Sequence, residues 1–169
     1  MLEPSANGGS AYLIDTRTGE YGSAAAWVEQ FAHVWAAPSE RLDRLMALLG
    51  PDIVLKAPTV PPKTIGQQAG RKAFVRALHA MPDLSASIMR WSACGDVIFI
   101  EMTFRATIGR RQVAWHDVDR ILFRDGVAVE RIAYFDPAPV RRAFLGSPAA
   151  LRQYLRLRFG TRGSQSKSE

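Results

Sequence analysis

The spacing of apolar residues changes once along the chain, from a helical period to an alternating one. Between residues 23 and 82, apolar side chains recur every three to four positions, which is typical of helices with one buried face. From residue 84 to residue 135 they alternate with polar residues or form β-branched runs, which is typical of strands. The pattern therefore predicts helices first and a sheet afterwards.

Three helices are expected in the first half of the chain. The first follows an N-cap at Ser23, the second follows an N-cap at Ser39 and stops at Gly50-Pro51, and the third lies between Gly66 and Pro82. Their apolar stripes are Trp27, Phe31, Val34 and Trp35; Leu42, Leu45, Met46 and Leu49; and Phe74, Val75, Leu78 and Met81.

Five strands are expected. One, at residues 52–57, interrupts the helices, and four follow at residues 84–91, 97–107, 112–123 and 127–135. The last four are joined by short glycine-containing turns, of which Asp125-Gly126 is the strongest hairpin signal, so they should form an antiparallel meander. The order predicts an α+β fold, with three N-terminal helices packed on a curved, mostly antiparallel sheet.

A chain of 169 residues is long enough for one domain with a substantial core. We expect a flexible extension at residues 1–22, the domain itself at 23–146, and a basic C-terminal helix with a disordered tail at 147–169.

The composition is that of an ordinary globular protein, with 47% hydrophobic and 22% charged residues. No apolar run approaches the roughly 20 residues that span a bilayer, and the start of the chain has no signal-peptide pattern. Cys94 is the single cysteine, which fits a cytoplasmic protein. Because no metal-ligand spacing, phosphate loop or nucleophile elbow occurs, we expect no cofactor and no metal.

The net charge of +6 comes with a crowding of arginines near the C-terminus. Our preferred interpretation is a solvated helix face, and we expect no nucleic-acid partner. Contact of the basic C-terminal helix with an anionic membrane surface is the alternative.

Four local features carry a resemblance to a known group of proteins. They are the strand at Asp52-Ile53-Val54, the proline loop that leads to Gly66, the turn Arg124-Asp125-Gly126, and the end Tyr134-Phe135-Asp136-Pro137. Residues 24–139 resemble SnoaL-like polyketide cyclases and the related nuclear transport factor 2, ketosteroid isomerases and limonene-epoxide hydrolases. The resemblance implies a cone-shaped fold with a pocket for a small hydrophobic molecule and a homodimer built through the convex sheet face.

The turn at Gly109-Arg110 pairs residue 108 with residue 111 and so fixes which residues share a face. A slip of one residue would exchange the faces of the second strand. In the unslipped register one face holds Glu101, Thr103, Arg105, Ala114, His116, Val118 and Arg120, and the other holds Met102, Phe104, Ala106, Val113, Trp115, Asp117 and Asp119.

The resemblance places the first of these faces in the pocket. His116 occupies the position at which the isomerases have an oxyanion-stabilising acid. Glu101 and Thr103 occupy the positions of an Arg and an Asp of the hydrolases, and Asp136 matches a second Asp of the hydrolases. Asp117 and Asp119 are then salt-bridge partners on the dimer face. The expected pocket lining is Trp27, Phe31, Trp35, Leu55, Leu78, Met81, Thr103, Val118, Arg120 and Tyr134.

The catalytic residues of the isomerases and of the hydrolases are both incomplete in this chain. Ala57 occupies the position of the isomerase base, and Glu101 and Thr103 replace the Arg and Asp of the hydrolases. We predict cofactor-free acid–base catalysis, as a cyclase, isomerase or hydrolase, with Asp136 as the acid or base, His116 as its partner and Glu101 assisting. Each has a structural alternative. In these alternatives, Asp136 would cap the end of the sheet, His116 would be a hydrogen-bonded structural residue, and Glu101 would form an ion pair with Arg105 or Arg120. The alternative function is a non-catalytic binding or scaffold protein.

Overall fold

The computed structural model describes residues 21–59 and 64–159. Its helices are α1 (Tyr21–Ala36), α2 (Leu42–Ala47), α3 (Gln67–Ala80), α4 (Ala138–Leu145) and α5 (Pro148–Phe159). Its strands are β1 (Leu49–Lys56), β2 (Thr64–Ile65), β3 (Ser85–Cys94), β4 (Val97–Ile108), β5 (Arg111–Arg124) and β6 (Val127–Tyr134).

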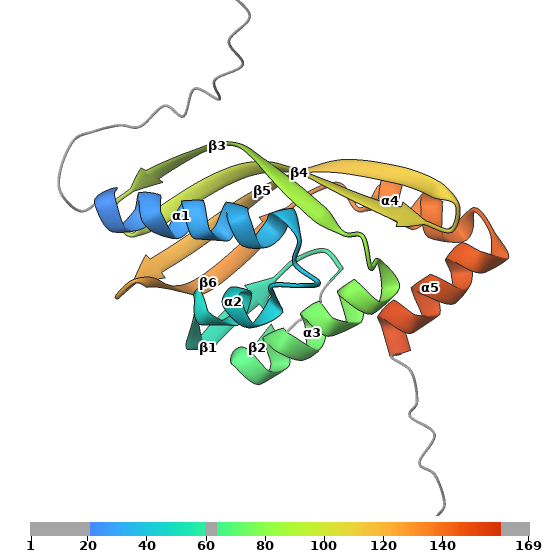
Figure 1. The fold of residues 1–169 in the computed structure, drawn as a ribbon, viewed down its shortest axis with the longest axis horizontal. Coiled ribbons are helices and arrows are strands. Elements are labelled where there is room, and N and C mark those ends of the chain that lie inside the picture. Colours follow the sequence, from blue (N-terminus) through green and yellow to red (C-terminus); the bar gives the residue numbers. More distant parts are fainter. Residues whose placement is uncertain (1–20, 60–63, 160–169) are drawn as a thin grey trace, which may run out of the picture.

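One six-stranded sheet with the order β2-β1-β6-β5-β4-β3 forms the frame of the molecule (Figure 1). Strands β3 to β6 form the expected antiparallel meander, whereas β1 joins β6 in parallel. The β1–β6 pairing holds the first half of the chain against the second.

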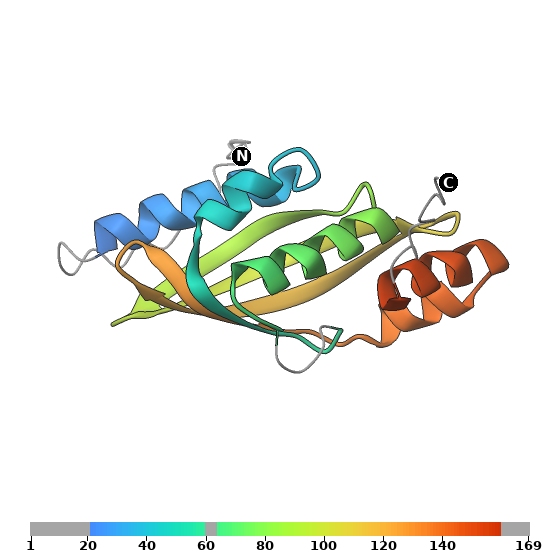
Figure 2. The ribbon, with the colours of Figure 1, turned by 90° about the horizontal axis from the view of Figure 1, so that it is seen from below.

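The sheet is strongly curved, and α1, α2 and α3 lie on its concave side (Figure 2). Helices α4 and α5 form a hairpin at the end of the sheet away from the start of α1. This is the mixed α+β architecture that the order of apolar patterns predicts.

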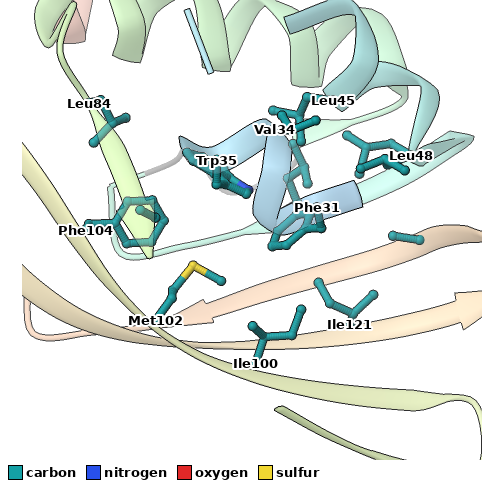
Figure 3. Packing of buried hydrophobic residues seen from close by; sticks show 14 of the residues in the cluster. Phe31, Val34, Trp35, Leu45, Leu48, Leu84, Ile100, Met102, Phe104 and Ile121 are labelled. Carbon is teal, nitrogen blue, oxygen red and sulfur yellow. The ribbon is translucent and has the colours of Figure 1, made fainter. Parts of the chain in front are cut away.

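The core lies between α1, α2 and the concave face of β4, β5 and β6. Figure 3 shows Phe31 and Trp35 of α1 facing Ile100, Met102 and Phe104 of β4. The side chains of Phe31, Ile100 and Met102 are at most 1% exposed. Full burial of each such side chain stabilises the fold by roughly 1.5–3 kcal/mol.

Four local expectations need correction. Helix α1 begins at Tyr21, two residues before the expected cap Ser23, and α2 begins after Arg41 rather than Ser39. Gly50 and Pro51 lie inside β1 instead of ending a helix, because β1 starts at Leu49 and pairs there with β6. The short strand β2 was not expected. Most of the predicted extension and of the predicted tail (residues 1–20 and 160–169) lies outside the described residues.

The α4–α5 hairpin is anchored to the domain by one glutamine. Gln153 Nε2 donates hydrogen bonds to the carbonyl oxygens of Ala80 (3.0 Å) and Thr107 (3.3 Å), and its Oε1 accepts one from the Gly109 amide. On the inner side of the hairpin, the Phe144 and Tyr154 rings lie 5.7 Å apart. The hairpin therefore packs on the β4–β5 turn as part of the domain.

Gly109 and Gly126 form a matched pair that tests this packing. Both have positive φ (+66° and +81°), so alanine at either position costs about 1–2 kcal/mol of backbone strain. A Cβ at Gly109 would also lie 3.0 Å from Ser147 Oγ and 3.2 Å from Ala150 Cβ, whereas nothing lies within 4 Å at Gly126. In urea unfolding, we expect Gly109→Ala to lose about 1 kcal/mol more than Gly126→Ala. Equal losses would show that α5 does not press on this turn.

Candidate functional site

A cavity of about 130 Å³ lies between α1, α3 and the concave face of the sheet. A dry cavity of this size holds a molecule about as large as one six-membered ring. Its lining residues are Trp35, Pro38, Leu45, Leu55, Lys56, Ala57, Thr59, Ala73, Phe74, Ala77, Leu78, Met81, Leu84, Phe104, Trp115, Asp117, Arg131, Ala133 and Phe135.

Aromatic rings give the cavity flat walls. Trp115 stacks on Phe104 with centroids 5.4 Å apart and an interplanar angle of 9°. Two further rings extend this pair. The Trp35 centroid lies 5.0 Å from that of Phe104 and 6.0 Å from that of Phe74, and the Phe135 centroid lies 6.4 Å from that of Trp115. Such walls favour a planar, apolar ligand.

Two of the polar lining residues, Asp117 and Arg131, form a cluster with the buried Asp119, which does not itself line the cavity; the other polar lining residues are Lys56 and Thr59. Arg131 Nε donates a hydrogen bond to Asp119 Oδ2 at 2.7 Å, and Arg131 Nη2 lies 4.0 Å from Asp117 Oδ2. The side chains of Asp117 and Asp119 are 1% and 0% exposed. Both Asp117 oxygens are covered and accept no well-formed hydrogen bond.

One guanidinium cannot neutralise two carboxylates, so the cluster is electrically neutral when the two acids hold one proton. Burial is the largest cause of the shift in both acids and raises their pKa values. Burial and the neighbouring Asp119 raise the pKa of Asp117 to about 8, although Arg131 acts in the opposite direction. Because Asp119 has the direct bond to Arg131, we assign the carboxylate to Asp119 and the proton to Asp117.

Aromatic faces also hold the Arg131 guanidinium. Its central carbon lies 5.2 Å from the Trp35 ring centroid and 5.9 Å from the Phe31 centroid. These cation–π contacts offset part of the cost of burying the charge. Helix α1 and strand β6 are thereby joined across the core.

Alternation along two neighbouring strands brings this site together. Trp115, Asp117 and Asp119 are spaced two residues apart on β5 and share a face. On β6, Arg131 and Ala133 occupy the same face, because Asp119 pairs with Ala133 and Ile121 pairs with Arg131.

The predicted hairpin register is correct, but the predicted pocket face is wrong. Thr103 pairs with His116 and Ile108 with Arg111, as expected. However, the side that faces the helices is the one with Met102 and Phe104, because that set is the more continuous apolar surface. Residues on the outer face of the sheet, away from the cavity, are Glu101, Thr103, His116, Val118, Arg120 and Tyr134.

The predicted catalytic residues have other contacts in the structure. His116 Nδ1 lies 3.2 Å from Thr103 Oγ1, and Glu101 forms an ion pair with Arg90 instead of Arg105 or Arg120. Asp136 directly follows the lining residue Phe135, but its own side chain is exposed and accepts a hydrogen bond from the Ala138 amide at 2.9 Å. The structure does not bring these three residues together in the cavity.

The rest of the predicted lining, outside strands β4 to β6, is partly correct. Trp35, Leu55, Leu78 and Met81 line the cavity. Trp27 and Phe31 belong to the core instead: their rings stack 4.8 Å apart, and Trp27 Nε1 donates a hydrogen bond to the Leu48 carbonyl oxygen at 3.0 Å.

The sequence interpretation missed the acidic pair at Asp117 and Asp119, which it placed on the outer face. A usable signal existed, because both acids alternate with Trp115 on the face that pairs with Met102 and Phe104. Among the described residues, no three His, Cys, Asp or Glu side chains are grouped to hold a metal ion. None of the helices in this part of the chain is both long and apolar enough to cross a membrane.

The SnoaL-like domain family matches residues 28–131, which include β1 to β5, Asp117, Asp119 and Arg131. The chain belongs to the SnoaL-like family. No curated protein matches the sequence.

Solved structures with the same fold include several polyketide-related proteins. A protein assigned as a SnoaL-like polyketide cyclase from Jannaschia sp. CCS1 superposes with a TM-score of 0.69 at 15% identity, over 80% of this chain and 100% of its own. IdmH from Streptomyces antibioticus, assigned as a polyketide cyclase, gives 0.58 at 21% identity over 73% and 98%. TerC, co-crystallised with polyporic acid, gives 0.62 at 15% over 69% and 96%. At these identities the likeness shows the fold, which is of the nuclear transport factor 2 kind.

The acid pair makes the stability of this SnoaL-like protein depend on pH. The folded protein holds a proton on Asp117 up to about pH 8, whereas the unfolded chain loses it near pH 4. The free energy of unfolding should therefore fall as pH rises between these values, by at most ~1.4 kcal/mol per pH unit. Asp117→Asn removes this proton, so its stability relative to wild type should increase from pH 5 to pH 8 in urea unfolding.

The exposed Asp136→Asn variant is the control, and its stability relative to wild type should change much less across the same range. A difference between Asp117→Asn and wild type that is independent of pH would contradict the buried proton.

Proposed function

We propose that this SnoaL-like protein binds a small planar carbonyl compound and catalyses proton transfer on it without a cofactor. The reaction class is cyclisation, isomerisation or hydrolytic addition. Asp117 is the proton-carrying group, and the Arg131–Asp119 pair positions it.

The observation that carries this proposal is Asp117, the one acid among the lining residues of a largely aromatic and aliphatic cavity, coupled to the buried Asp119. An acid that is neutral near pH 7 can donate a hydrogen bond to a carbonyl oxygen as negative charge develops there. With a pKa near the working pH, a fraction of the molecules carries an ionised Asp117, which can remove the proton from the carbon next to the carbonyl group to give an enolate and return a proton to that carbon afterwards. Asp117 has both properties.

Asp117 must turn to reach a ligand, because its oxygens are covered in the structure. Arg131, whose Nη2 lies 4.0 Å from Asp117, is bonded to Asp119 at 2.7 Å. Rotation of the Asp117 side chain toward the ring-sized cavity therefore does not require the ion pair to break. Arg131 also lines the cavity and can stabilise an enolate oxygen.

The similar proteins agree with a ligand of this kind. Two of them are assigned as polyketide cyclases, and TerC was crystallised with polyporic acid. The aromatic walls of this chain suit a flat ring in the same way.

Deuterium exchange of ketone α-protons tests the proposal without knowledge of the natural substrate. Three ketones serve as probes: cyclohexanone, which has the size of one ring, and acetophenone and 2-indanone, which contain a flat aromatic ring. Exchange is followed by NMR in deuterated buffer at pH 7. Wild type should accelerate exchange of at least one probe, and Asp117→Asn should reduce that rate about 100-fold or more. Asp136→Asn and His116→Asn, on exposed side chains outside the cavity, should retain it.

Loss of exchange in Asp136→Asn with retention in Asp117→Asn would contradict this assignment and restore the one based on resemblance. Binding of the probes, seen by quenching of tryptophan fluorescence, without any exchange would favour a non-catalytic binding protein.

We also propose a homodimer through the outer face of the sheet. Phe99, Val118 and Tyr134 are exposed there by 41%, 39% and 54%. Val118 pairs with both Glu101 and Tyr134, so it lies at the centre of this apolar area. An area of this kind on a sheet is typical of an interface.

The Val118→Glu variant would place a charge at the centre of that interface and should shift the protein from dimer to monomer in sedimentation velocity. Ile65→Glu, also exposed but at the β2 edge, is the matched control and should leave the mass unchanged. A wild-type monomer would exclude the dimer.

A further inference from the structure

We infer that the outward face of the α4–α5 hairpin is a docking surface for anionic lipid. The hairpin lies beyond the matched family region, which ends at residue 131. The lining of the cavity includes none of the described side chains of α4 and α5 (residues 138–155), so this surface is separate from the proposed active site.

The whole net charge of the protein is located in this part of the chain. Residues 138–169 contain seven of the 22 basic residues and one of the 16 acidic residues, which accounts for all of the charge of +6. The remaining 137 residues are neutral. Residues 138–159, which form the hairpin, contain five arginines and no acidic residue.

Three of the charged side chains on the hairpin are exposed and not neutralised. Arg141, Arg142 and Arg152 are exposed. Among the described residues, no Asp or Glu forms an ion pair with any of them. By contrast, Arg90, Arg124 and Arg131 on the sheet each have an acidic partner.

Large apolar side chains lie among these arginines. Leu145 at the end of α4 is 73% exposed, and Leu151 and Leu155 on α5 are 43% and 45% exposed. Residues 151 and 155 are one turn apart, and Arg152 lies beside them on the same outward half of the helix. The opposite half of α5 is anchored by Gln153 and by buried Ala150.

Leucines flanked by arginines fit a lipid surface better than they fit a nucleic acid. Leucine side chains gain free energy by entering the acyl boundary, and arginine side chains can stay with the headgroup phosphates. A nucleic acid would use the arginines but leave the leucines in water. The packing of the hairpin on the domain, through Gln153 and Gly109, holds this amphipathic face in place before binding.

Flotation of the full chain with lipid vesicles tests this inference. Vesicles of phosphatidylcholine alone are compared with equal mixtures of phosphatidylcholine and phosphatidylglycerol, at 0.05 and 0.5 M NaCl. We expect binding to the anionic vesicles only, weaker at the higher salt. The triple variant Arg141→Gln/Arg142→Gln/Arg152→Gln should lose affinity roughly 100-fold, and Leu145→Ser/Leu151→Ser/Leu155→Ser about tenfold or more.

The matched control is Arg44→Gln/Arg71→Gln/Lys72→Gln, which removes the same charge from exposed positions on α2 and α3. It should keep its affinity within about threefold, because salt screens distant charges. No binding to the anionic vesicles would overturn the inference. A second outcome would also overturn it: the leucine variant binds the anionic vesicles as tightly as wild type does, and a DNA duplex displaces the protein from these vesicles. That outcome would indicate a surface that binds any polyanion. Thermal unfolding followed by circular dichroism is the control for the folding of each variant.

Discussion

Burial of the Arg131 guanidinium is the constraint that organises the interior of this domain. A charge whose side chain is only 11% exposed is stable only with an opposite charge and polarisable neighbours around it. Asp119 supplies the first at 2.7 Å, and the Trp35 and Phe31 rings supply the second. Helix α1 is therefore tied to β5 and β6 by one cation as well as by the apolar core.

The second acid, Asp117, adds a proton to this arrangement. A single buried salt bridge would be inert, but two acids beside one guanidinium must keep a proton. That proton lies in the wall of a ring-sized aromatic cavity, where the low polarity strengthens any hydrogen bond to a ligand. Stability and the proposed reactivity thus depend on the same cluster.

The local pattern predicted most of the fold, whereas the resemblance assigned the pocket to the wrong face of the sheet. Alternation and the Asp125-Gly126 turn predicted β3 to β6 and their register, because both signals are local. The parallel pairing of β1 with β6 was not predictable from local pattern, since it joins distant segments. The continuous apolar set of Ile100, Met102 and Phe104 identifies the face that packs on the helices, and the resemblance points to the other face. Asp117 and Asp119 pair with Met102 and Ile100 on this same face. Their burial among apolar residues is understandable only with Arg131, which comes from another strand.

The most direct test of this account is to observe the proton on Asp117. The side-chain carboxyl carbons of the aspartates are labelled with ¹³C and followed by NMR as a function of pH, and the Asp117 signal is assigned by its absence in Asp117→Asn. If Asp117 holds the proton, its signal should be typical of a protonated acid at pH 6 and titrate near pH 8, and the Asp119 signal should be typical of a carboxylate. A signal for Asp117 that is fully ionised at pH 6 would contradict it.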